Sequence, residues 1–392
     1  MDLKARLCAK GFTQIKGISF NETYAPVVRA ASLRFQLADA TRRRLKLDQV
    51  DFASAFLQCP IDGEVWLRCP GGVDVPPGHM LKLNKSIYGL KQSSHLWNLS
   101  LHRMLVDMEF RQAVGDPCLY VYDHNGVYVT ISTWVDDCVV AYNDTDAWLK
   151  MYKAMGERYP MSRSGKLSFC LGMEVTQAED CSWIELSQTK YIEDMASEFV
   201  QELGEYDWSH SKFETPGVHG QNFAREVLLN INPEANELTG ACRFRELLGK
   251  MNYAMCWTRP DVATVLGLLA RHQNCYYKMH WKALRHCAVY MIKSKNRCLR
   301  FSAPAGAEDD HLNLIGFVDS DFSGDVETSK SRTGYIYTCC AAHQLCGEVL
   351  LQSITAQSTS ATQEKNPPMS HYVHFFLLLA ICVPLHCGFR LH

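Results

Sequence analysis

Segment 118–142 constrains the fold of this 392-residue chain more than any other part of the sequence. Two runs rich in β-branched and aromatic residues flank Asn125-Gly126, and Asn-Gly is the strongest short-range signal for a β-hairpin. The second run continues into Asp136-Asp137, and another β-rich run follows at once. The pattern therefore predicts a hairpin and then a tight turn between two strands, with two adjacent aspartates at that turn.

A third aspartate is expected at a strand end. Asp51 lies where an apolar, strand-like run passes into a helix-like run. An Asp-rich surface turn is the plain alternative for Asp136-Asp137. Carboxylates that converge from two strand ends would instead bind two divalent cations, which neutralise their repulsion and clamp the oxygens of a phosphoryl transfer about 3.5–4 Å apart. Asp51, Asp136 and Asp137 are therefore candidate metal ligands.

Basic residues concentrate in two separate parts of a chain whose formal net charge is only −2. Residues 1–50 carry ten basic and four acidic side chains, and residues 271–300 carry eight basic and no acidic ones. Two separated basic stretches suit a nucleic-acid channel, because phosphate contacts dominate the affinity for nucleic acids. A solvated surface is the other interpretation of each stretch.

The cysteine usage bears on the cellular compartment. Seventeen cysteines would suit a disulfide framework only behind a signal peptide, and the charged start of the chain has no apolar segment of that kind. We therefore expect reduced thiols and an intracellular protein. No Cys-x-x-Cys pair occurs, and the apolar run 375–384 is about half the length of a membrane-spanning helix and contains a proline. We expect no membrane helix.

A series of short motifs follows one another along the chain. They are Lys4-Ala5-Arg6-Leu7, Ala9 to Gln14, Tyr24 to Val28, Asp51 with Ala55-Phe56-Leu57, Leu83 to Gln92, Trp97, Val135-Asp136-Asp137, Phe169 to Met173, Leu186-Ser187-Gln188, Thr258-Arg259-Pro260-Asp261 and His280-Trp281. In order and spacing they resemble the Pol region of a Ty1/copia-type LTR retrotransposon, from its reverse transcriptase into the start of its ribonuclease H. The resemblance extends over about residues 4–360.

The resemblance implies an α+β protein with the fingers, palm and thumb of a right-hand polymerase and a partial RNase H-like α/β domain at its C-terminal side. Residues 1–215 would form the reverse transcriptase, beginning within the fingers, and 216–309 a mainly helical connection segment. Residues 310–364 would form the partial ribonuclease H. The tail 365–392 matches nothing in the family, and we interpret it as the product of a frameshift or a mis-joined exon.

The function implied by the resemblance is that of an RNA-directed DNA polymerase, a nucleotidyltransferase that extends a primer on an RNA or DNA template. Its partners would be the RNA template, the DNA primer, the RNA–DNA hybrid, dNTPs and other Pol and Gag products of the transposable element. It would act in the cytoplasm, in a virus-like particle, or in the nucleus, before DNA integration. Two Mg²⁺ ions, or Mn²⁺ in their place, would be the cofactors.

The resemblance also assigns roles within the metal site. Asp51 and Asp136 would ligate both ions, and Asp137 would complete the carboxylate cluster. Arg6 and Lys10 match positions that clamp the phosphates of the incoming nucleotide, although ordinary surface charge is the alternative.

Three further residues match the family's nucleotide pocket. Tyr88-Gly89 resembles the loop beside the sugar and base, with a plain turn glycine as the alternative. Phe56 matches the aromatic position that excludes a 2′-hydroxyl, and by itself would equally suit the core.

Some residues depart from the family pattern. Trp134 stands where the family has tyrosine, and Ser93-Ser94-His95 replaces Ala-Pro-Arg. In the ribonuclease H region Asp319 would be the first metal ligand, but the following glutamate motif is altered around Glu364, so we expect that activity to be lost. A decayed remnant that only binds nucleic acid is therefore the alternative function.

Overall fold

The fold is described from a computed structural model, which defines residues 6–72, 76, 78–203, 214–217 and 243–302 and the backbone of 314–320 and 333–339. The chain divides into two compact units at Leu167/Ser168. The predicted features at residues 358–392 lie outside the described residues. In the part of the chain that is described, no helix is long and apolar enough to cross a membrane.

The first unit is built on a six-stranded antiparallel sheet with the order β4-β5-β6-β7-β1-β8. A separate pair of short strands, β2 and β3, lies outside it. The elements of the unit are η1 (Gly11–Thr13), α1 (Ala30–Arg42), β1 (Lys46–Phe52), η2 (Ala55–Gln58), β2 (Trp66–Leu67), β3 (Leu81–Lys82), α2 (Ser93–Asp107), β4 (Arg111–Gln112), β5 (Leu119–His124), β6 (Val127–Trp134), β7 (Asp137–Tyr142), α3 (Thr145–Arg158) and β8 (Met161–Lys166).

The predicted hairpin is confirmed. Strands β5 and β6 pair from Leu119↔Ser132 to His124↔Val127 around a two-residue turn. The turn residues Asn125 and Gly126 have φ of 53° and 78°, as a type I′ turn requires. Strand β7 then pairs with β6, so the adjacent aspartates do lie at a tight turn between two strands.

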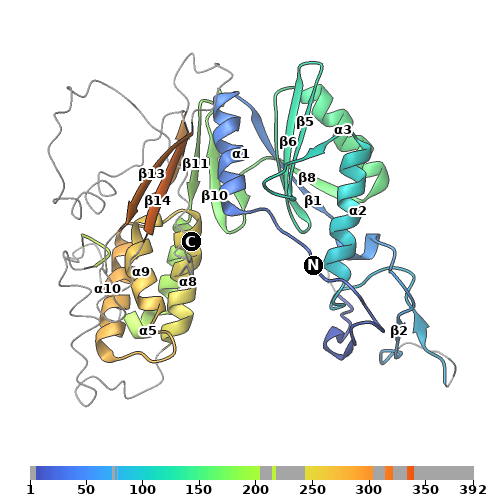
Figure 1. The fold of residues 1–392 in the computed structure, drawn as a ribbon, viewed down its shortest axis with the longest axis horizontal. Helices are drawn as coiled ribbons and strands as arrows, with labels where there is room; N and C mark the ends of the chain where they lie inside the picture. The colour runs from blue at the N-terminus through green and yellow to red at the C-terminus, as the bar shows by residue number, and fades with distance from the viewer. Residues whose placement is uncertain are drawn as a thin grey trace, which may run out of the picture. The chain divides into compact units, whose positions relative to one another are not determined.

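Helices cover both faces of this sheet (Figure 1). The side chains of Val50, Val129 and Ile131 join residues of α2 and α3 in one apolar core. The opposite face meets α1, where the amide of Gln36 donates to the carbonyl oxygens of Thr130 and Val139 at 3.1 Å. Because side chains alternate along a strand, Asp51 and Asp137 belong to the α1 face.

The chain leaves β1 by a turn rather than by the expected helix. Ser54 has a left-handed conformation (φ 54°), and only the short 3-10 helix η2 follows. Cys59 is extended at φ −90° and ψ 136°, as expected for a residue that precedes a proline. Pro60 thus prevents the helix-like run from continuing.

The second unit contains a four-stranded sheet with the order β12-β11-β10-β9 and a helical core. Its elements are β9 (Phe169–Cys170), β10 (Met173–Gln177), β11 (Trp183–Ser187), α4 (Thr189–Glu198), α5 (Val200–Leu203), α8 (Phe244–Trp257), η4 (Pro260–Val262), α9 (Ala263–Ala270), α10 (Lys278–Lys293), β12 (Leu299–Ser302) and the hairpin β13 (Leu314–Ser320) with β14 (Thr333–Cys339). The His280-Trp281 motif lies in the first turn of α10. Strand β12, from the expected connection segment, pairs with β11 of the expected reverse transcriptase region, and both strands belong to the second compact unit.

A buried ion pair organises the helical part of the second unit. Arg259 is 1% exposed and pairs with Asp261 at 2.8 Å. The Arg259 guanidinium also donates to the carbonyl oxygens of Met291 and Ser294 near the end of α10. Asp261 accepts from the hydroxyl of Tyr290 at 2.7 Å. The motif 258–261 therefore ties η4 to the C-terminal end of α10.

Candidate active site

The three predicted carboxylates meet at one end of the first unit's sheet. Asp51 in β1 and Asp137 in β7 are direct partners across the antiparallel pair. Asp136 precedes Asp137 in the β6–β7 turn, and its carbonyl oxygen accepts from the backbone N–H of Phe52 at 3.0 Å. Strand pairing thus brings together the backbone positions that carry Asp51, Asp136 and Asp137.

The turn that carries Asp136 has a strained backbone. Of its two central residues, both of which are described, Val135 has a φ of 58° and Asp136 does not lie at positive φ. That combination is the type II′ pattern, in which the first position normally holds glycine. A β-branched residue there is a genuine outlier. The turn is therefore held in place by its surroundings and not by the preference of its own sequence.

The electrostatic surroundings of Asp137 favour a bound cation. Burial raises the pKa of the Asp137 carboxyl, and the negative charges of Asp136 and Asp51 raise it further, while a hydrogen bond from Gln49 lowers it. The Cβ atoms of direct strand partners lie about 4.5–5.5 Å apart, so the negative charges of Asp51 and Asp137 are close enough to repel each other. A divalent cation would remove this repulsion.

The donor chemistry of the site fits Mg²⁺, because carboxylate oxygens are the hard ligands that this ion prefers. The described residues nevertheless contain no group of three His, Cys, Asp or Glu side chains already gathered around one point. The strand register brings the backbone positions of the three aspartates together, but their side chains are not gathered around one point.

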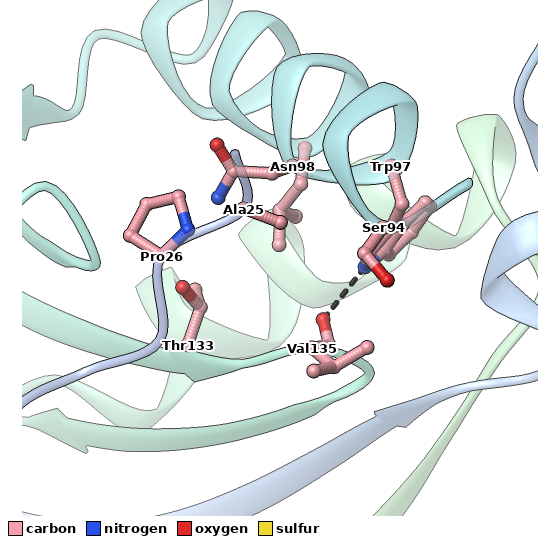
Figure 2. Close-up of a pocket in the computed structure, with 8 residues that line it drawn as sticks. Ala25, Pro26, Ser94, Trp97, Asn98, Thr133 and Val135 are labelled. Atoms are coloured by element: carbon pink, nitrogen blue, oxygen red, sulfur yellow. Dashed lines mark hydrogen bonds between the residues drawn. The ribbon is translucent and has the colours of Figure 1, made fainter. Parts of the chain in front are cut away.

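A small cavity lies beside the turn (Figure 2). It has a volume of about 100 Å³ and its lining includes Ser94 and Asn98 of α2, Ala25 and Pro26. The indole Nε1 of Trp97 donates to the carbonyl oxygen of Val135 at 2.6 Å at this place. Trp97 is 1% exposed. Helix α2 thus contacts the carboxylate-bearing turn directly.

Three of the predicted nucleotide-pocket residues contact one another. The rings of Phe56 and Tyr88 meet edge to face with their centroids 5.1 Å apart. The Arg6 guanidinium lies 5.3 Å from the centroid of the Tyr88 ring. Phe56 is half-buried, packed against the core that contains Val50. This series of contacts extends from η2, just after Asp51, to the N-terminal segment.

The N-terminal segment is interlocked with the loop at Tyr88-Gly89. The Ala9 N–H donates to the carbonyl oxygen of Tyr88 at 2.7 Å. Gly89 has a φ of 87°, and a Cβ there would lie 2.2 Å from the carbonyl oxygen of Ala9. Only glycine fits this position. Lys10 is exposed in the same segment, and within the described residues no carboxylate pairs with Lys10 or Arg6.

The residues that depart from the family pattern have structural partners. Ser93 is buried, and its hydroxyl donates to the carbonyl oxygen of Ile87 at 2.6 Å. The His95 ring contacts the carbonyl oxygen of Tyr24 through Nδ1 at 2.6 Å. Trp134 is the strand partner of Asp137, so it lies beside the carboxylates.

Two residues that contribute to this site were not identified as such from the sequence. Gln49 was missed, although it precedes Asp51 by two residues and so lies on the same face of β1. Trp97 was recognised only as a motif residue, and its bond to Val135 could not be read from spacing. Alternation along β1 would have found Gln49.

Comparisons with known proteins identify the family of the chain. Residues 1–205, slightly more than half of the chain, match the family described as "Reverse transcriptase (RNA-dependent DNA polymerase)". The chain is 29% identical over 364 residues, 92% of its length, to the "Retrovirus-related Pol polyprotein from transposon TNT 1-94" of Nicotiana tabacum, of which it covers 26%. It is 27% identical over 335 residues, 85% of its length, to the Pol polyprotein from transposon RE2 of Arabidopsis thaliana, of which it covers 22%.

A yeast protein is similar over most of its own length. The chain is 22% identical over 322 residues to the transposon Ty5-1 protein of Saccharomyces cerevisiae, a match that covers 80% of this chain and 98% of the yeast protein. The chain spans about a quarter of the length of the two plant polyproteins. Its relatives over most of its length are thus proteins of copia-type transposons, and the chain belongs to the reverse transcriptase (RNA-dependent DNA polymerase) family.

Proposed function

We propose that this chain is the RNA-directed DNA polymerase of a copia-type retrotransposon and that the sheet of its first unit is the palm of a right-hand polymerase. The pairing of Asp51 with Asp137, beside Asp136 in the turn, supports this proposal most strongly. The primer 3′-hydroxyl attacks the α-phosphate of a dNTP, a new P–O bond forms, and pyrophosphate leaves. Two divalent cations, Mg²⁺ or Mn²⁺, would neutralise the charge on the attacking and leaving oxygens.

Separate groups of residues bind the cations and the triphosphate. Asp51, Asp136 and Asp137 hold the cations. Arg6 and Lys10, which have no carboxylate partner in the described structure, bind the triphosphate, because fixed cations stabilise charge most where water is excluded.

The sugar and base occupy the space bounded by two aromatic side chains. Phe56 and Tyr88, in edge-to-face contact, limit the room beneath the sugar, and Gly89 permits the close approach of the backbone. RNA or DNA templates and their primers bind the two basic stretches, residues 1–50 and residues 271–300, through phosphate contacts, and the thumb belongs to residues 1–215.

The hairpin of β13 and β14 is proposed as the start of an RNase H-like domain without hydrolytic activity. Asp319 is the backbone partner of Gly334 near one end of this hairpin. A single carboxylate position without its later partners cannot hold two hard cations. We expect no Mg²⁺-dependent cleavage of an RNA–DNA hybrid. Cleavage that disappears with Asp319→Asn would contradict this part of the proposal.

A second function, binding of nucleic acid without synthesis, is favoured by the departures from the family pattern. Trp134 lies beside Asp137 without the tyrosine hydroxyl, and His95 contacts Tyr24 in place of an arginine. Both changes lie near the site, so a decayed copy would keep its fold and its basic surface.

Primer extension separates the two functions. The purified full chain is given a DNA primer annealed to an RNA template, the four dNTPs, and Mg²⁺ or Mn²⁺. We expect products longer than the primer with either ion and none in the presence of EDTA. Binding of the template-primer without any extension would show that the chain is a decayed remnant that only binds nucleic acid.

A further inference from the structure

Both peptide groups that flank Asp136 are held by hydrogen bonds from other elements. Before it, the carbonyl oxygen of Val135 accepts from the indole Nε1 of Trp97 at 2.6 Å. After it, the carbonyl oxygen of Asp136 accepts from the N–H of Phe52 at 3.0 Å. The first donor belongs to α2, and the second belongs to the strand that carries Asp51. Asp136 is thus fixed from two sides.

The two anchors also contact one another. The rings of Phe52 and Trp97 meet edge to face with centroids 5.0 Å apart, and both side chains are 1% exposed. Tyr159 closes the cluster, 5.4 Å from Trp97. Buried side chains in close packing have little freedom to move. The packing of Trp97 against Phe52 and Tyr159 therefore holds the indole N–H in a fixed position next to the turn.

The backbone strain of the turn makes this hydrogen bond important. The cost of placing a non-glycine residue at positive φ is similar in size to the contribution of one intramolecular hydrogen bond. The cavity of about 100 Å³ beside Val135 leaves room for the Val135–Asp136 peptide to rotate. Loss of the indole donor would therefore allow the turn to relax and Asp136 to change direction.

We propose that Trp97 is a positioning residue, which sets the orientation of Asp136 by holding the Val135–Asp136 peptide plane. Trp97 touches neither the cations nor the substrates and acts only through Val135. The consequence for catalysis rests on the proposed polymerase function, whereas the consequence for the turn does not.

The test compares Trp97→Phe with Trp148→Phe in the full chain. Trp148 is a matched control, because it is 0% exposed and its Nε1 donates at 2.8 Å to Asp48 on another part of the sheet. Mn²⁺ binding is measured by electron paramagnetic resonance, and Mg²⁺-dependent primer extension gives kcat, KM for dNTP and the half-saturating Mg²⁺ concentration. Crystal structures of the parent and of Trp97→Phe show the Val135–Asp136 peptide.

The proposal has a distinct signature in these measurements. Trp97→Phe weakens Mn²⁺ binding at least about fivefold and lowers kcat by about 10- to 100-fold, because small misplacements of a catalytic group cost that much. The KM for dNTP stays within about twofold, and Trp148→Phe changes neither Mn²⁺ binding nor kcat beyond that range.

Two results would overturn the positioning role. One is equal loss of Mn²⁺ affinity in both variants, which would indicate general destabilisation. The other is an unrotated Val135–Asp136 peptide in Trp97→Phe with unchanged Mn²⁺ affinity. If the parent chain synthesises no DNA, the polymerase proposal fails, but the Mn²⁺ titration and the two structures still decide the role of Trp97.

Discussion

Asp51 and Asp137 are direct strand partners, so the carboxylates of β1 and β7 lie on the same side of the sheet. Burial and the charges of Asp136 and Asp51 raise the pKa of Asp137, which means that the folded protein binds its proton more tightly than the unfolded chain does. Stability therefore decreases as the pH rises from the ordinary aspartate pKa, near 4, to the raised one.

Asp137→Asn should accordingly raise the melting temperature of the metal-free protein at pH 7. The gain should disappear below about pH 4, where Asp137 is protonated in both states. Asp123→Asn is the control, because Asp123 is exposed on β5 of the same sheet. Differential scanning calorimetry with EDTA at both pH values measures the effect, and a lower melting temperature at pH 7 would argue against repulsion at the site.

Phe56→Val tests the nucleotide pocket. If the ring of Phe56 closes the space beneath the sugar, its loss should raise ribonucleotide incorporation relative to deoxyribonucleotide incorporation by at least about tenfold, since overpacking a rigid site costs about 1–3 kcal/mol. The kcat/KM for a matched rNTP and dNTP gives the ratio. Leu57→Val, at a neighbouring residue that is 39% exposed, should leave the ratio unchanged. Equal losses with both nucleotides would mean that Phe56 only supports the core.

Gly89→Ala tests the interlock between the loop and the N-terminal segment. Gly126→Ala provides the control, because Gly126 also has a positive φ (78°) but has open space around it. The control should lose about 1–2 kcal/mol of unfolding free energy from its backbone conformation alone. Gly89→Ala should lose more, and its KM for dNTP should rise because Arg6 and Lys10 are displaced. If urea unfolding shows equal losses of unfolding free energy in Gly89→Ala and Gly126→Ala, the close contact with Ala9 does not contribute to stability.

Asp261→Asn tests the buried ion pair of the second unit. The carboxylate is buried, which raises its pKa, but Arg259 and the hydroxyl of Tyr290 outweigh burial and leave that pKa lowered. The pair therefore stabilises the fold above the ordinary aspartate pKa, and this stabilisation is lost as the pH falls below about 4. Breaking such a pair costs about 3–5 kcal/mol at pH 7.

Urea unfolding at pH 7 and at pH 3.5 measures that loss. Glu193→Gln removes an exposed partner of Lys295 and should cost at most about 1 kcal/mol. The difference in the free energy of unfolding between Asp261→Asn and the parent should be smaller at pH 3.5 than at pH 7. An equal difference at both pH values would show that packing, and not charge, makes Asp261 important.

Local sequence patterns predicted the parts of the fold that depend on neighbouring residues. The Asn125-Gly126 hairpin and the turn at Asp136 both follow from turn chemistry and from the alternation of strand residues. The short 3-10 helix after Asp51 was harder to foresee, because Ser54 adopts a left-handed conformation that its type does not require. The pairing of β12 with β11 joins residues more than 100 positions apart, and no local pattern reports it.

The aspartates of the candidate site could be predicted from the sequence, but the contacts that hold their turn in place could not. Residue types and order identified Asp51, Asp136 and Asp137, and the strand register places their backbones together. The bond from Trp97 to Val135 depends on how α2 lies on the sheet, which is a tertiary property. Strain at Val135 is likewise visible only in the backbone angles.

We propose that DNA synthesis depends on the carboxylates at the β6–β7 turn. Primer extension on an RNA template with Mg²⁺, measured together with template-primer affinity for the parent, Asp136→Asn and Asp123→Asn, tests this dependence. We predict that Asp136→Asn abolishes extension and keeps template-primer affinity within a few-fold, because that affinity comes mainly from phosphate contacts remote from the cations. Asp123→Asn should match the parent in both measurements. Undiminished extension by Asp136→Asn would contradict the account.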